Sequence, residues 1–259
     1  MSKTIAFSFD DGRRDTYTNA FKILNDRSIP FTINVATDFV LNESKYSEFL
    51  SADNRSMTPD QLLECYKSGV EIACHGHTHK NTESDILDNI AALRSIGIDA
   101  DIFGFASPNS YITENNLSEI SSLISDGKIA YVRSGIQVKR EGFLYSVMTY
   151  VERKIHSPWL YYILNRRNII KRTKSSIIPS VAITRYTTLK QLLYFIKKMN
   201  DNDAVIFMFH SVIDSTEQGY GLDNWYFDKQ KFANLCDSLK SSGDIYFSTV
   251  RELHSKRGV

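Results

Sequence analysis

Residues 5–12 read IAFSFDDG, and residues 70–79 read VEIACHGHTH. Each stretch is an apolar run of strand length that stops at chemically active side chains, two carboxylates in the first and three imidazoles in the second. A third apolar run, residues 204–209, stops in the same way at His210. Because the carboxyl ends of parallel strands meet on one face of an α/β fold, we expect these side chains to converge there.

Strands and helices alternate along most of the chain. Further strands are expected at 31–35, 103–106, 129–132, 143–151, 181–184 and 245–248. Helices are expected at 15–28, 83–96, 114–125, 189–199 and 228–242, and another begins at Pro59, with Thr58 as its cap and Gly69 as its stop. This alternation predicts an α/β fold with parallel strands, in a barrel or an open sheet. We expect one domain over 1–259, with a basic insertion at about 143–180.

The composition is that of a globular protein. Of 259 residues, 42% are hydrophobic and 24% are charged, which disfavours disordered, collagen-like and coiled-coil classes. No apolar run reaches the ~18 residues that span a bilayer. The three cysteines are too few and too scattered for a disulfide framework, and no signal-peptide pattern opens the chain, so we expect a cytoplasmic protein.

The charge is distributed unevenly. Residues 153–200 hold eleven Lys and Arg and no Asp or Glu, so with a net charge of +1 overall the rest of the chain carries −10. One interpretation is a solvated helical face. The other is a surface for anions, such as lipid phosphate or an anionic membrane, which predicts peripheral contact at the inner membrane face. No nucleic-acid partner is expected.

The residues at the strand ends suit a metal site. Asp10 and Asp11 would repel if both were buried, unless a cation or hydrogen bonds compensated them; the alternative is a solvated Asp-Gly turn. His75 and His79 are four residues apart, so one helical turn would place them on the same side; the alternative is a surface histidine cluster. Two imidazoles and one carboxylate suit Zn²⁺ or a similar divalent ion and leave a position open for water.

Four segments together resemble one family. SFDDG at 8–12 is similar to the TFDDG signature of the polysaccharide deacetylases, the carbohydrate esterase family 4 enzymes with the NodB-homology fold. Residues 70–79 match that family's second motif, a strand ending in His-x-x-x-His. FASP at 105–108 is similar to its third motif, and His210 to its last. The order and spacing agree over roughly residues 3 to 250.

The resemblance implies a distorted (β/α) barrel and a metal-dependent carbohydrate N-deacetylase, a hydrolase of linear amides. It implies a divalent metal, Zn²⁺ first, with Co²⁺, Mn²⁺, Ni²⁺ or Fe²⁺ as alternatives, held by Asp11, His75 and His79. Asp10 would be the base and His210 the acid. The expected substrate is an N-acetylated sugar of a glycan or of a glycan precursor, which a polyprenyl phosphate would carry if the basic segment contacts a membrane.

The chain departs from the family pattern at two motifs. Ala106 stands where many members have an Arg that braces the base, and the Asp-x-x-Asp-Trp motif is not visible. Arg133, at the end of the next strand, would supply the missing cation, or it is an ordinary surface Arg. Pro108, Arg133 and Trp225 are the predicted substrate-binding residues, although Trp225 equally suits packing.

Three other functions compete with N-deacetylation. A deformylase or another small-amide hydrolase would use the same residues on the same fold. A catalytically silent glycan- or lipid-binding protein would account for the missing Arg, but it would have no use for Asp10, Asp11, His75, His79 and His210 together. A non-haem iron oxygenase shares the ligand set, but the adjacent carboxylates do not suit it.

Overall fold

A computed structural model describes residues 2–42, 55–110, 112, 114–134, 142–171 and 177–257. Its centre is a sheet in which nine strands of the described chain pair in parallel, in the order β6-β5-β4-β3-β2-β1-β8-β7, with β11 beside β1. The strands are β1 (Lys3–Phe9), β2 (Phe31–Val35), β3 (Glu71–Cys74), β4 (Phe103–Ala106), β5 (Ile129–Ser134), β6 (Ile177–Pro179), β7 (Val181–Ala182), β8 (Ala204–Phe209) and β11 (Ile245–Phe247).

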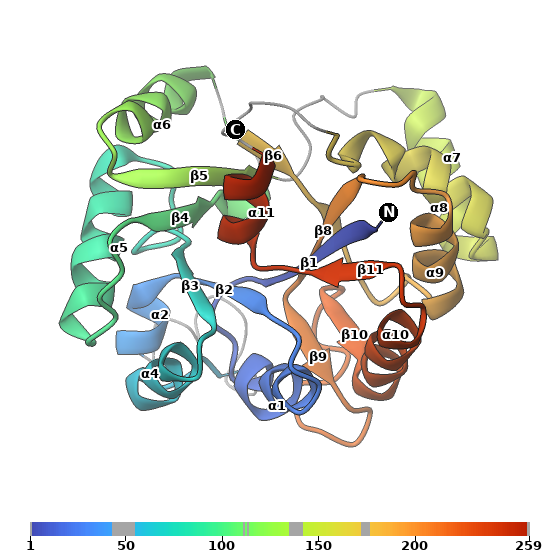
Figure 1. The fold of residues 1–259 in the computed structure, drawn as a ribbon, viewed down its shortest axis with the longest axis horizontal. Coiled ribbons are helices and arrows are strands. Elements are labelled where there is room, and N and C mark those ends of the chain that lie inside the picture. The colour runs from blue at the N-terminus through green and yellow to red at the C-terminus, as the bar shows by residue number, and fades with distance from the viewer. Residues whose placement is uncertain are drawn as a thin grey trace.

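The sheet curls into a nearly closed barrel. β6 and β7 lie at opposite ends of the strand order, yet Ser180 alone separates them in the chain. This short connection brings the two edges of the sheet together, and the strands form a ring (Figure 1). The predicted barrel is therefore confirmed.

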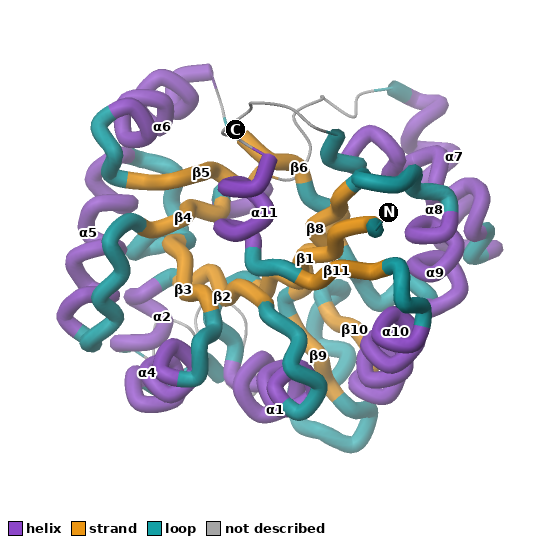
Figure 2. The backbone as a smooth tube through the Cα atoms, in the orientation of Figure 1, coloured by secondary structure: helices purple, strands orange, loops and turns teal. Residues whose placement is uncertain are grey.

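Helices surround the ring (Figure 2). They are α1 (Lys22–Asn25), α2 (Thr37–Leu41), α4 (Pro59–Lys67), α5 (Glu83–Ser95), α6 (Glu114–Ser125), α7 (Phe143–Ile155), α8 (Pro158–Asn165), α9 (Leu189–Lys197), α10 (Lys229–Ser241) and α11 (Val250–Arg257), with the shorter turns η1 (Thr16–Phe21), η2 (Pro108–Ser110) and η3 (Arg166–Asn168). A two-stranded sheet pairs β9 (Ser211–Ile213) with β10 (Tyr226–Asp228). Among the described residues, no helix combines the length and the hydropathy that a membrane span requires.

Alternation along β1 separates the two sides of the barrel wall. Ile5, Phe7 and Phe9 belong to the main hydrophobic core with residues of the surrounding helices, such as Phe232 of α10. Ala6, between them, belongs to a second cluster that includes Val250 and Leu253 of α11. Since successive strand residues point to opposite faces, this second cluster, which also contains Ile206 and Tyr131, lies on the other side of the barrel wall from the main core.

Most predicted elements are confirmed. α4 begins as expected, because Thr58 and Gln61 form a reciprocal capping box and Pro59 occupies the first turn. The helix expected at 15–28 begins instead as the π-helical turn η1 and continues as α1. Segments α2, α8, β6, β9, β10 and α11 were not predicted.

One prediction is wrong. Residues 143–151, expected as a strand, form most of helix α7. The run is rich in aromatic and β-branched residues, which favour strands, but its apolar positions also recur at helical spacing. Residues 143–180, expected as a basic insertion, contain α7 and α8 and also β6, which is a strand of the barrel.

Candidate active site

The end of β1 delivers two carboxylates into the barrel mouth. The Asp10 N–H donates to the Phe209 carbonyl at 2.9 Å, which extends the pairing of β1 with β8 by one residue. The chain then turns sharply, because Asp11 and Gly12 have φ values of 73° and 69°. Asp10 and Asp11 are each only 2% exposed, so the alternative of two solvated acids does not hold.

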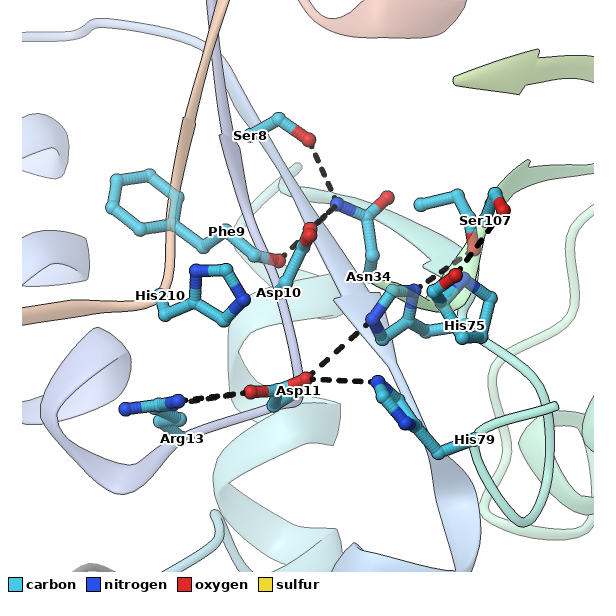
Figure 3. Close-up of polar contacts among 12 residues, drawn as sticks. Ser8, Phe9, Asp10, Asp11, Arg13, Asn34, His75, His79, Ser107 and His210 are labelled. Carbon is cyan, nitrogen blue, oxygen red and sulfur yellow. Dashed lines mark hydrogen bonds and ion pairs between the residues drawn. The ribbon is translucent and has the colours of Figure 1, made fainter. Parts of the chain in front are cut away.

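Arg13 holds one carboxylate oxygen of Asp11, and the other oxygen faces the two histidines. Arg13 Nε and Nη2 donate to Asp11 Oδ2 at 3.2 and 3.1 Å, and Arg13 Nη1 donates to Asp223 at 2.9 Å. Asp11 Oδ1 is buried and has no hydrogen-bond partner among the described residues. This oxygen lies 3.5 Å from His75 Nε2 and 3.6 Å from His79 Nε2 (Figure 3).

The two histidines meet through a turn and not through the helical turn that the spacing predicted. Residues 75–80 follow β3 without helix, and Gly76 has a φ of 75°. A Cβ on Gly76 would lie 2.5 Å from the Lys80 carbonyl oxygen, so the turn requires glycine. Asp85 of α5 accepts hydrogen bonds from the Thr78 and Lys80 N–H groups and so holds the turn in place.

Hydrogen bonding and burial prepare both imidazoles to bind a cation. His75 Nδ1 lies 2.8 Å from the Ala106 carbonyl, which can only accept, so Nδ1 carries the proton and Nε2 faces Asp11. Burial, together with His75, lowers the pKa of His79 to about 4, so that ring is neutral at pH 7. Burial alone would lower the pKa of His75, but Asp10 and Asp11 outweigh it and raise that pKa. The site therefore attracts positive charge.

This donor set fits a divalent metal ion. Ligand atoms of Asp11, His75 and His79 all lie within 4.8 Å of one another. An unsatisfied buried carboxylate oxygen facing two imidazole nitrogens is the arrangement expected of a two-His, one-carboxylate centre. Zn²⁺ suits three such ligands with one coordination position open.

Asp10 is positioned from β5. Arg133 Nη2 lies 2.7 Å from each Asp10 oxygen, and the Arg133 side chain is fully buried. Asn34 of β2 donates to Asp10 Oδ1 at 2.8 Å. Burial alone would raise the pKa of Asp10, but the Arg133 guanidinium, with His75 and His210, lowers it below its usual value. Asp10 is therefore ionised at neutral pH.

The register explains how Arg133 reaches Asp10. Ala106 of β4 pairs with Arg133 of β5, so the two residues are neighbours on adjacent strands. Because paired residues in a sheet point to the same face, Arg133 approaches from beside the position at which Ala106 replaces an arginine. Its burial shows that it is not the surface Arg of the alternative interpretation.

His210 and Trp225 lie together on the other side of the carboxylates. Their ring centroids are 4.8 Å apart, and Trp225 is 40% exposed. In Figure 3, Asp10 and Asp11 lie between His210 and the pair formed by His75 and His79. Burial lowers the pKa of His210, although Asp11 opposes the shift, so the ring is neutral in the resting protein.

Pro108 and several residues that the sequence analysis missed complete the site. Pro108 is buried in η2, where its carbonyl accepts hydrogen bonds from Asn81 and Ser107. Arg13, Asn34 and Asp85 were not predicted. A polar Asn inside the apolar run of β2 was a detectable signal for Asn34, whereas the contacts of Arg13 and Asp85 follow from loop geometry that spacing does not reveal.

Comparisons with known proteins agree with this geometry. The family model described as polysaccharide deacetylase matches residues 1–123, which contain the Asp pair, both histidines and the FASP segment, and the predicted resemblance to that family is confirmed. A search of the curated proteins found no match.

Solved structures share the fold over the whole chain. A family 4 carbohydrate esterase from Bacillus anthracis has a TM-score of 0.55 at 12% identity, covering 98% of this chain and 83% of its own. The Xyl-CE4 domain of a multidomain xylanase from the hindgut metagenome of Trinervitermes trinervoides has a TM-score of 0.52 at 18% identity, covering 100% and 93%. A family 4 acetyl xylan esterase from Clostridium thermocellum, in complex with cobalt, has a TM-score of 0.51 at 17% identity, covering 99% and 92%. At these identities the likeness establishes the fold.

Proposed function

Because the chain carries the polysaccharide deacetylase pattern in residues 1–123 and has the family 4 esterase fold, we propose that it is a metal-dependent hydrolase that removes an N-acetyl group from an amino sugar. The observation that carries the proposal is the unsatisfied Asp11 Oδ1 facing His75 Nε2 and His79 Nε2. A divalent ion held by these three side chains would act as a Lewis acid on the amide carbonyl and would acidify water.

Asp10 is the proposed base. Its carboxylate is ionised and held by Arg133 and Asn34, so it can accept the proton of the attacking water without a change of rotamer. The low pKa that Arg133 imposes makes Asp10 a weak base, which suffices only for water that is already acidified. Arg133 is therefore proposed as a positioning residue, because its burial keeps it from the substrate.

His210 is the proposed acid. It is neutral in the resting protein, so it must take up a proton from the solvent as negative charge builds on the substrate oxygen, while Asp10 keeps the proton taken from the attacking water until product leaves. His210 then donates its proton to the departing amine, which is a poor leaving group while unprotonated. The Trp225 ring beside His210 would orient the imidazole and cover one side of the sugar.

A groove next to Trp225 supports a sugar as the substrate. Trp225 lines it together with Tyr145, Tyr161 and Tyr186, and polar residues such as Asn165 also line it. Aromatic faces with interspersed hydrogen-bonding groups are typical of sites that fix the orientation of a small polar ligand. Pro108 is the proposed substrate contact on the side of the histidines.

We also propose a cytoplasmic location with peripheral contact between residues 153–200 and lipid phosphate. The three cysteines are buried and unpaired, as is usual in a reducing compartment. The run of eleven basic residues without an acidic one supports the contact with anions. A glycan precursor linked to a lipid phosphate is the substrate class that unites these features.

The test is metal content measured by mass spectrometry on protein purified without added metal. We expect about one divalent ion per wild-type chain and loss of the ion in Asp11→Ala and His79→Ala. His156→Asn, at an exposed histidine with a φ of 50°, should retain it, because Asn tolerates that backbone conformation. Acetate release from N-acetylated amino sugars then tests the activity. No metal in the wild type after soaking in Zn²⁺ would favour the silent binding protein instead.

A further inference from the structure

Helix α7 turns its apolar side to solvent. Phe143 is 86% exposed, Leu144 71% and Tyr150 65%, and Trp159, in the first turn of α8, is 59% exposed. Residues 143, 144, 147, 150, 151 and 155 are all exposed apolar positions of α7. At 100° per residue they occupy one continuous stripe along the helix.

The opposite side of α7 is polar and faces the protein. Glu152 is only 7% exposed and accepts a hydrogen bond from Gln191 of α9. Thr149 Oγ1 is likewise buried. An ordinary surface helix buries its apolar stripe and exposes its polar side, so α7 has the reverse arrangement. An exposed apolar stripe of this length marks a surface that contacts something other than water.

Exposed cationic side chains accompany the stripe in the same stretch of sequence. Glu152 is the sole acidic residue in 142–171 of the sequence, and its side chain is buried. The exposed basic residues of the same segment are Arg153, Lys154, Arg166, Arg167 and Lys171. The exposed surface of the hairpin formed by α7 and α8 (143–165) and of the residues that follow it up to 171 therefore combines apolar and positive groups.

We propose that the outer face of the α7–α8 hairpin binds an anionic lipid bilayer, with α7 lying in the interface. Phe143, Leu144, Val147 and Tyr150 would enter the boundary between headgroups and acyl chains, and the surrounding cations would contact lipid phosphates. The proposal deepens the lipid contact proposed above by assigning it to α7, outside most of the basic segment. It does not require hydrolytic activity.

A second copy of this chain suits the face less well. In a twofold dimer each patch would meet itself, so the five cations of one copy would meet the same five of the other. Nothing acidic on the patch would compensate them, because Glu152 is buried. An anionic bilayer supplies both the apolar layer and the negative charge.

The position of the hairpin suggests what the proposed membrane contact would do for the candidate active site. Figure 1 shows α7 at the periphery of the molecule, outside the ring of strands. Tyr145, Thr149 and Arg153 of α7 line the groove that reaches Trp225, whose ring packs at a tilt against His210. A protein bound through the outer side of this helix would hold that groove at the level of the lipid headgroups.

Sedimentation of the purified full chain with vesicles tests the proposal. We expect binding to vesicles of equal parts phosphatidylcholine and phosphatidylglycerol, weaker binding as salt rises, and little binding to phosphatidylcholine alone. Leu144→Glu should weaken binding about tenfold or more, and Arg166→Glu with Arg167→Glu should do the same. An acidic residue in the first turn of α7 is compatible with the helix dipole, so the fold should persist.

Matched variants elsewhere provide the controls. Leu117→Glu, at a 38% exposed leucine near the start of α6, and Lys22→Glu with Lys231→Glu should bind like the wild type. Asp11→Ala should also bind normally, so the vesicle result stands whether or not the protein is a deacetylase.

Four results would overturn the proposal. They are no binding to either vesicle, equal binding to both, competition by inorganic phosphate at matched ionic strength, or a wild-type dimer in light scattering that Leu144→Glu converts to monomer without any vesicle binding.

Discussion

Asp10 and Phe143 represent opposite extremes of burial in this protein. Asp10 carries a charge inside the barrel at 2% exposure, and Arg133 and Asn34 hold it there. Phe143 is an aromatic ring at 86% exposure on α7. Both reverse the usual preference of their residue type, and both lie in regions to which we assign function. At Asp10 the reversal is maintained by partners inside the protein, whereas at Phe143 we propose a partner outside it.

The largest effect is expected at the centre of the barrel. Asp10→Asn keeps the size and one acceptor oxygen of the side chain but cannot take up a proton. We expect kcat/KM for deacetylation to fall about a thousandfold while metal content stays at the wild-type level. Parallel activity and mass-spectrometry measurements separate the two. An active Asp10→Asn variant would remove Asp10 from the chemistry.

Arg133→Leu tests whether internal partners maintain the buried charge. The substitution leaves Asp10 without its guanidinium, so we expect the free energy of unfolding of the metal-free protein to fall by about 4 kcal/mol. Adding Asp10→Asn to Arg133→Leu removes the uncompensated charge and should restore part of that loss. Urea denaturation of the four proteins gives the coupling. Simple additivity would show that the two side chains do not depend on each other.

Asp15 is another buried carboxyl, and its raised pKa makes the free energy of unfolding depend on pH. Burial, opposed by Arg13 and assisted by Glu217, raises the pKa of Asp15 to about 6 from its ordinary 3.8. The folded protein therefore holds this proton more tightly than the unfolded chain, and stability is lost as pH rises from about 4 through 6. The loss amounts to about 3 kcal/mol above pH 6.

Asp15→Asn should abolish that loss of stability, because an amide does not titrate. The fold should persist, because the amide oxygen can still accept the hydrogen bond from the Val212 N–H. Relative to the wild type, the variant should gain about 3 kcal/mol in unfolding free energy between pH 4 and pH 7. Denaturant titrations at a series of pH values measure the difference. A difference that does not change with pH would mean that Asp15 titrates normally.

The smallest effect on stability is expected at the exposed side of α7. Phe143→Ala removes a ring that water already surrounds, so the free energy of unfolding in solution should change by less than about 0.5 kcal/mol. Phe232→Ala is the matched control, because its ring packs on Phe7, Phe9 and Phe209 and its loss should cost about 4 kcal/mol. A large cost at Phe143 would show that α7 packs its apolar stripe within the protein.

The difference between the two regions also explains what could be predicted from the sequence. The convergence of strand ends in a parallel sheet predicted that carboxylates and imidazoles would meet, and the family resemblance singled out Asp11, His75 and His79, whose ligand atoms do lie close together. The strand predicted at 143–151 failed because this run is rich in aromatic and β-branched residues, which favour strands, although its apolar positions recur at helical spacing. In this run composition and spacing disagree, and the spacing was the better guide to the structure.

The supporting contacts of the site were the least accessible part. Arg133 and Asp10 are 123 residues apart in the chain, and their contact depends on the register of β4 with β5. The sequence suggested Arg133 as a substitute cation because it ends the neighbouring strand, but not that it would be fully buried. Asn34 donates to Ser8, Phe9 and Asp10, and Asp85 accepts from Thr78 and Lys80, but no spacing rule predicts these partners.

The position of Ser180 between β6 and β7 bears on the order in which the site forms while the chain folds. This serine joins β6 to β7 and accepts a hydrogen bond from Arg133 Nη1 at 3.1 Å, while the other terminal nitrogen of Arg133 holds Asp10. The three candidate metal ligands are encoded by residue 79, long before Ser180 leaves the ribosome. A nascent chain could therefore hold all three proposed metal ligands early, whereas the proposed base is fully braced only when the last edges of the sheet meet. The protein would then become catalytically competent only once the ring of strands has closed.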